Sequence, residues 1–107
     1  EKIFFYLDAH SQEHIPLMNE LSKCLEFKNS IILIDDFKVP GDKNFGFDIY
    51  KGEELSLQNY EMLNDYDLYF PNYSPNKDNG SRGYVLIDIS GKNKNVFSKI
   101  KNLDNFN

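Results

Sequence analysis

The chain has 107 residues, of which 40% are aliphatic, aromatic or cysteine and 27% are charged, a composition typical of one globular domain or part of one. Its net charge of -5 argues against a surface for nucleic acid or anionic membrane, because both depend on clustered Lys and Arg. The apolar runs are too short to span a membrane, the single cysteine, Cys24, allows no internal disulfide, and no secretory signal is present, so we expect a cytoplasmic protein.

The first third of the chain predicts a strand, a helix and a second strand. Residues 3–8 form an apolar run closed by a carboxylate, a pattern typical of a parallel strand that is buried on both faces. Between residues 15 and 25 apolar side chains recur at helical spacing, with Cys24 on the buried flank. A second apolar run at 31–36 again ends in carboxylates. Together these segments predict a βαβ unit with a right-handed crossover.

The rest of the chain predicts a loop and a hairpin. Residues 37–52 are rich in Gly, Pro and Asp and predict a long loop, and 55–65 show a weaker helical pattern. The aromatic run 66–73 and the apolar run 84–89 flank a polar turn, which predicts an antiparallel hairpin with Tyr69 and Phe70 in its core. Residues 97–103 predict a short terminal helix. The fold class is therefore α/β, in the order β-α-β-loop-α-β-β.

The predicted sheet has an edge without a neighbour, because its first strand begins at residue 3. Unpaired edges pair readily with another strand, and a domain of this size has only a small core. We therefore expect residues 1–107 to be a single domain that forms the C-terminal half of a larger one. A homo-oligomer formed through the exposed sheet edge is the alternative.

Carboxylates close both predicted parallel strands, Asp8 the first and Asp35 with Asp36 the second. Parallel strands end at the same edge of a sheet, about 5 Å apart, and open α/β sheets bind their ligands there. Three carboxylates could thus share a hard cation such as Mg²⁺. His10 lies two residues past Asp8 and could accept a proton from a substrate hydroxyl. Each of these side chains could equally serve as a turn or helix cap.

The loop after the second strand carries two candidate substrate-binding residues, Lys38 and Tyr50. Lys38 could meet an anionic group or remain a solvated loop residue. The alternation of glycines and aromatics from 39 to 50 could form a lid over a substrate. The same alternation is also compatible with an ordered surface loop that packs Phe45, Phe47 and Tyr50 on the core.

Two short motifs carry a resemblance to a known family. The sequence IFFYLDAH at 3–10, a helix, and IILIDDF at 31–37 resemble the second half of class I S-adenosylmethionine-dependent methyltransferases. More narrowly, they are similar to the Mg²⁺-dependent sugar O-methyltransferases and their cephalosporin-hydroxylase-like relatives. Those proteins carry Asp-x-Asp at the end of strand four and Asp-Asp at the end of strand five, which the 27-residue gap from Asp8 to Asp35 suits. The predicted hairpin resembles their strands six and seven, of which the last runs antiparallel.

The resemblance implies a partial Rossmann-like sheet, with Asp8, Asp35 and Asp36 as Mg²⁺ ligands. His10 stands where the family has its second Asp, the proposed general base. The resemblance also implies S-adenosylmethionine as cofactor, bound by residues expected upstream of Glu1, so the fragment alone is expected to be inactive. The implied activity is metal-dependent O-methyl transfer to a small hydroxylated substrate such as a sugar.

Two other functions stay open. The sequence Asp8-Ala9-His10 also resembles an Asp-x-His variant of the glycosyltransferase metal motif, which binds Mn²⁺ and a sugar nucleotide. That interpretation leaves Asp35 and Asp36 unexplained. The third interpretation is a non-catalytic Rossmann-like fragment that acts as an association module through its strand edge.

Overall fold

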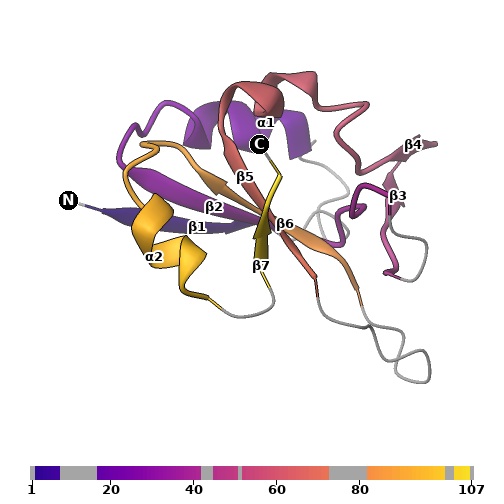
Figure 1. The fold of residues 1–107 in the computed structure, drawn as a ribbon. Helices are drawn as coiled ribbons and strands as arrows, with labels where there is room; N and C mark the ends of the chain where they lie inside the picture. The colour runs from indigo at the N-terminus through magenta and orange to yellow at the C-terminus, as the bar shows by residue number, and fades with distance from the viewer. Residues whose placement is uncertain are drawn as a thin grey trace.

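The computed structural model describes residues 2–7, 17–41, 45–50, 52–72, 82–100 and 103–106. Their main feature is a five-stranded mixed sheet in the order β1-β2-β6-β5-β7 (Figure 1). Its strands are β1 (Ile3–Leu7), β2 (Ser30–Asp35), β5 (Asp67–Pro71), β6 (Tyr84–Asp88) and β7 (Leu103–Asn105). A separate pair is formed by β3 (Ile49–Tyr50) and β4 (Glu53–Glu54), and the helices are α1 (Leu17–Cys24), a 3-10 helix (Glu61–Asp65) and α2 (Lys94–Ser98).

The βαβ unit and the hairpin are both present. β1 pairs parallel with β2, with Ile3 opposite Ser30 and Leu7 opposite Ile34, and α1 lies between the two strands in the sequence. β5 and β6 form the antiparallel hairpin. β6 also pairs antiparallel with β2, so it lies between β2 and β5. The prediction of an α/β fold with a C-terminal antiparallel hairpin is confirmed at this level.

The hydrophobic core lies on one face of the sheet, beneath α1 and the 3-10 helix (Figure 1). Alternate residues of each strand point to this face, as the two-residue repeat of a strand requires. Burial of each large apolar side chain stabilises the fold by about 1.5–3 kcal/mol. Cys24, Tyr69 and Phe70 are buried as predicted. The fully buried core includes Leu21, Ile32, Ile34, Leu55, Leu63, Leu68, Val85 and Ile87.

The opposite face is covered only in part by α2 in the described chain. Phe97 of α2 packs on Tyr69 with ring centroids 4.6 Å apart. Farther along the sheet, Phe4 and Tyr6 of β1 are 59% and 55% exposed. The prediction that β1 is buried on both faces is therefore wrong. β1 is the edge strand of the described sheet, and α2 packs instead near β5 and β7, at the other end of the strand order.

The C-terminal segment also differs from the prediction. The helix begins earlier than expected, at Lys94, and ends at Ser98, whereas Leu103 lies in strand β7. Pairing of β7 with β5 determines this conformation, together with the N–H of Phe106, which donates to the carbonyl of Leu68 at 2.8 Å. The helical pattern at 55–65 yields only the 3-10 turn, and the expected loop 37–52 includes the short strand β3.

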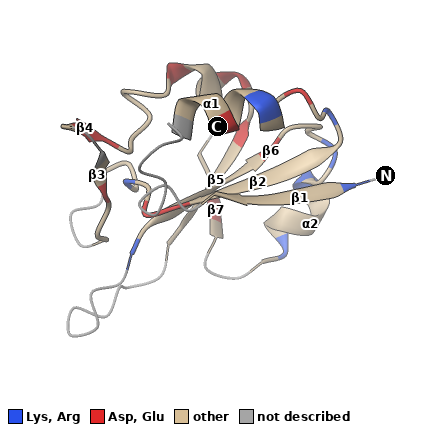
Figure 2. Cartoon of the chain, turned by 180° about the vertical axis from the view of Figure 1, so that it is seen from behind, with Lys and Arg blue, Asp and Glu red and all other residues tan. Residues whose placement is uncertain are grey.

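Charged residues are spread unevenly along the sheet direction. Figure 2 shows acidic residues on β4, beyond the carboxyl ends of β1 and β2, and basic residues at the start of β1 and on α2. Among the described helices, none combines the length and the apolar character needed to cross a membrane.

Candidate functional site at the carboxyl edge of the sheet

Two of the predicted site residues lie together at the carboxyl end of β2. Asp35 is the last residue of the strand and Asp36 is the first residue after it. Asp8 and His10 lie outside the described residues, as does the side chain of Tyr50. Lys38 is described and lies farther along the same loop. The structure therefore gives the geometry of Asp35 and Asp36 and leaves the proposed contribution of Asp8 and His10 as a prediction.

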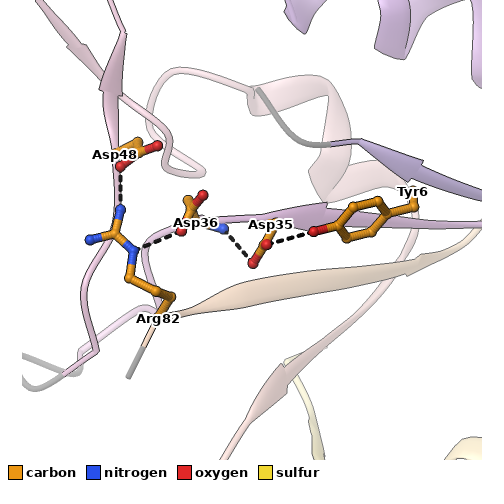
Figure 3. A network of polar contacts seen from close by, with 5 residues as sticks. All are labelled: Tyr6, Asp35, Asp36, Asp48 and Arg82. Carbon is orange, nitrogen blue, oxygen red and sulfur yellow. Dashed lines mark hydrogen bonds and ion pairs between the residues drawn. The ribbon is translucent and has the colours of Figure 1, made fainter. Parts of the chain in front are cut away.

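Asp35 is held by two donors from the protein. The hydroxyl of Tyr6 on β1 donates to Oδ2 at 2.7 Å, across the parallel strand pair (Figure 3). The backbone N–H of Asp36 donates to Oδ1 at 2.9 Å. Hydrogen bonds to both oxygens fix the orientation of the Asp35 carboxyl group at the sheet edge.

Asp36 is buried, with 5% of its surface exposed, and its charge is matched by a guanidinium. Nε of Arg82 donates to Oδ1 of Asp36 at 2.7 Å, and Nη2 of Arg82 pairs with Asp48 (Figure 3). The hydrogen bond to Asp36 raises the pKa of Arg82 above its usual value, so the guanidinium stays charged. Asp36 has φ = 57°, in the left-handed region that most residues avoid and that Asp tolerates better.

Three loop segments converge to build this arrangement. The N–H of Phe37 donates to the carbonyl of Gly83 at 3.1 Å, and the N–H of Gly83 donates to the carbonyl of Gly46 at 2.8 Å. The N–H of Asp48 donates to the carbonyl of Asp36 at 2.9 Å. The backbone itself therefore brings 36–37, 46–48 and 82–83 side by side. The side chains of Asp36, Asp48 and Arg82 meet as a consequence.

Two glycines make this close approach possible. A Cβ at Gly83 would lie 2.4 Å from the carbonyl oxygen of Phe37, which no real side chain tolerates without backbone movement. A Cβ at Gly46 would lie 2.9 Å from Nη1 of Arg82. Glycine is needed at Gly83 and leaves room for the guanidinium at Gly46. The sequence Arg82-Gly83 thus supplies the cation and the space it requires.

Lys38 belongs to a neighbouring region. Its Nζ lies 3.4 Å from a carboxylate oxygen of Glu54 and 5.2 Å from the ring centroid of Phe47. It also lines a cavity of about 240 Å³, which shares Pro40 and Phe106 with a second cavity of about 400 Å³. The second volume lies within the range of about 300–1,000 Å³ that is usual for small-molecule sites. The first cavity is lined by Lys38, Pro40, Glu54, Ser56, Leu57, Gln58 and Phe106.

The described carboxylates do not fit a divalent cation well. Within the described ranges, no three acidic, histidine or cysteine side chains are grouped so that they could hold a metal ion. Oδ1 of Asp36 already accepts a charged hydrogen bond from Arg82, and both oxygens of Asp35 accept hydrogen bonds. A cation at Asp36 would have to displace or adjoin the guanidinium, and like charges repel. We therefore derive no chemical step through a metal.

Sequence reasoning missed three residues of this site: Tyr6, Asp48 and Arg82. The sequence pattern indicates only that Tyr6 belongs to an apolar strand and Asp48 to a loop. A weak signal did exist for Arg82, because it is the only arginine in the sequence and directly precedes a glycine. Its partner Asp36 lies 46 residues away, a separation that no local pattern encodes.

Comparison of the chain with models of protein families, with characterised proteins and with solved structures finds no match. Function must therefore be argued from the geometry of the sheet edge and from the resemblance of the two strand-end motifs.

Proposed function

We propose that this chain is the C-terminal portion of an S-adenosylmethionine-dependent O-methyltransferase that acts on a small hydroxylated substrate such as a sugar. The observation that carries the proposal is the parallel pairing of β1 with β2, with Asp35 and Asp36 fixed at the carboxyl end of β2. In open α/β sheets, ligands bind in the crevice outside this edge.

The order of the strands gives further support. The methyltransferase resemblance places two parallel strands before a hairpin whose last strand runs antiparallel. Here β1 and β2 are parallel, and β6, the second strand of the hairpin, runs antiparallel to β2. β7 and the separate β3–β4 pair are additional to that pattern. The Rossmann-like identity of the sheet is accordingly part of the proposal.

The proposed chemistry relies on positioning and charge. S-adenosylmethionine, when bound, would supply the methyl group, and the chain would orient the attacking hydroxyl of the acceptor. Asp35, fixed by Tyr6 and by the N–H of Asp36, offers an acceptor for a substrate hydroxyl at the sheet edge. His10 is proposed as the base that accepts the proton of that hydroxyl. Lys38 and Tyr50 are proposed substrate contacts.

The experiment is a ligand screen followed by an activity assay on the full-length protein. Thermal shifts are measured with S-adenosylhomocysteine and, separately, with UDP-sugars plus Mn²⁺. Stabilisation by S-adenosylhomocysteine, with methyl transfer to a hydroxylated acceptor that falls in Asp35→Asn, supports the proposal. Stabilisation only by a UDP-sugar with Mn²⁺ would replace it with the glycosyltransferase interpretation.

A second candidate function is association through β1. This strand is at the edge of the described sheet, and its neighbouring side chains Phe4 and Tyr6 are more than half exposed. An edge strand offers unpaired backbone groups for pairing with another chain. Sedimentation equilibrium tests this: a monomer–dimer equilibrium that is weakened by Phe4→Lys favours an association module, and a monomer at all concentrations contradicts it.

A further inference from the structure

Arg82 lies where three loop segments meet, and its guanidinium contacts two carboxylates there. It bridges Asp36, which is buried, and Asp48, which belongs to a different loop segment. The bridge Gly46–Arg82 and the hydrogen bonds of Gly83 fix the backbone on either side of it. Figure 3 shows the guanidinium between the two carboxylates, with Asp35 next along the chain. Two ion pairs, a β-bridge and backbone hydrogen bonds therefore hold Arg82 against residues that are distant in the sequence.

We propose that Arg82 is the resident cation of this sheet edge, serving Asp36 in place of a divalent metal and holding that carboxylate in position. The inference rests on the proposed function in one respect, because that function makes the carboxyl edge of the sheet the reaction site. Arg82 is a positioning residue in this proposal, because it acts through Asp36.

The physical basis is the match between the guanidinium and its two partners. A guanidinium is planar, always charged and less strongly hydrated than an ammonium, so it suits a pair in which one carboxylate is buried. Asp36 is 5% exposed, and the desolvation of a buried carboxylate is offset only by well-placed hydrogen bonds and opposite charge, which Arg82 supplies. Arg82 itself keeps 44% of its side chain exposed, so its own desolvation is modest. The pair thereby fixes Asp36 at a low cost in solvation.

The same geometry predicts competition with metal. Asp36 and Asp48 face the same guanidinium of Arg82. Removal of that guanidinium leaves two neighbouring carboxylates, and Mg²⁺ is commonly held by one or two carboxylates with waters that complete its coordination. A variant without the guanidinium should therefore acquire an affinity for Mg²⁺ that the wild-type chain lacks.

The test measures thermal unfolding of the full chain with and without millimolar MgCl₂. We expect no Mg²⁺-dependent shift for the wild type and a rise of about 5 °C or more for Arg82→Gln. The double variant Arg82→Gln/Asp36→Asn should lose the shift, because the proposed metal ligand is removed. Lys38→Gln is the matched control, since it removes one positive charge from a nearby ion pair with Glu54 and should not create Mg²⁺ binding.

Saturable Mg²⁺ binding by the wild type that is abolished by Asp36→Asn would overturn the proposal, as would an Arg82→Gln variant that folds and ignores Mg²⁺. If Arg82→Gln does not fold, calorimetric titration of the wild type with Mg²⁺ and Mn²⁺ still decides between the two outcomes. Methyl transfer assayed in EDTA separates this inference from the proposed function. Methyl transfer that requires added Mg²⁺ would contradict the role of Arg82 but not the proposed function. Absence of methyl transfer both with and without Mg²⁺ would contradict the proposed function but not the role of Arg82.

Discussion

Two buried aspartates lie at opposite ends of the same sheet and are satisfied in different ways. Asp36 follows β2 at the carboxyl edge and pairs with a guanidinium from a distant segment. Asp88 ends β6 opposite Ile31, near the start of β2, and is 1% exposed. Its two oxygens accept from the backbone N–H and the side-chain amide of Asn93, both at 2.9 Å, and from Ser90 at 3.2 Å.

These different partners indicate that Asp88 is a structural carboxylate and that Asp36 is a candidate functional one. The partners of Asp88 are neutral, local and within five residues, so this network serves to join β6 to the start of α2. The partner of Asp36 is charged, distant in sequence and half accessible to solvent, and Asp36 itself has a strained backbone. Stored strain and a long-range charge pair are more typical of a site than of a scaffold.

The largest expected effect is at Asp88. Asp88→Ala would leave the buried N–H of Asn93 without its acceptor and the side-chain amide of Asn93 with only a long contact to Ser90 Oγ at 3.5 Å, at about 1–3 kcal/mol for each unsatisfied group. We expect a loss of about 3 kcal/mol in the free energy of unfolding, measured by urea denaturation. Asp88→Asn, which keeps one acceptor oxygen, should lose less. If Asp88→Ala costs no more than Asp36→Ala, the structural assignment of this carboxylate is incorrect.

The close approach at Gly83 comes next. In Gly83→Ala the new Cβ would lie 2.4 Å from the carbonyl oxygen of Phe37 and 2.9 Å from a methyl of Val39. The two backbone segments that meet here, after β2 and before β6, must move apart, and overpacking of this kind costs about 1–3 kcal/mol. Gly41→Ala is the control, because its added Cβ meets no atom of the described residues within 4 Å and its expected cost comes from φ = 74°. Equal losses in the two variants would show that close packing at Gly83 does not matter.

Asp36 should tolerate substitution better than Asp88. Removal of one partner from a buried ion pair normally leaves a costly buried charge, but Arg82 retains Asp48 and remains partly hydrated. Asp36→Ala should therefore lose only about 1–2 kcal/mol. Asp36→Gly loses the same ion pair but relieves the left-handed backbone, so it should be about 1 kcal/mol more stable than Asp36→Ala. The reverse order, seen in parallel denaturation curves, would argue against backbone strain at this position.

The sequence was informative where local pattern determines structure. Apolar runs located β1, β2 and the β5–β6 hairpin, and strand ends located Asp35 and Asp36. The exposure of Phe4 and Tyr6 was not predictable, since it depends on β1 being the edge strand and on where α2 packs. β7 has only three residues and forms through pairing with β5, so the helical pattern that ended at Leu103 was misleading.

Some features of the candidate site can likewise be predicted from the sequence, and others cannot. Strand-end carboxylates can be predicted because parallel strands end at one edge. The contacts of Arg82 cannot, because its partners come from loops that meet only after the sheet has formed. The buried hydroxyl of Tyr69 is a further example, since the aromatic run around it predicts only a core side chain. No partner for this hydroxyl is found in the described part of the chain.

The smallest effect concerns Tyr69, which lies in the middle of β5 opposite Leu86. Tyr69→Phe removes an unsatisfied buried hydroxyl, so stability at neutral pH should stay the same or rise by up to about 1 kcal/mol. Burial, with smaller contributions from Asp67 and Asp88, raises the pKa of Tyr69 in the folded state.

The unfolded chain therefore releases this proton first, and wild-type stability should fall as the pH rises above about 10. Tyr69→Phe lacks that loss, so the stability difference between the two proteins should widen with alkaline pH. Because the other tyrosines titrate in both proteins, only this difference is diagnostic. A difference that stays constant from pH 8 to pH 11 would mean that the hydroxyl of Tyr69 reaches water or a hydrogen-bond acceptor in solution.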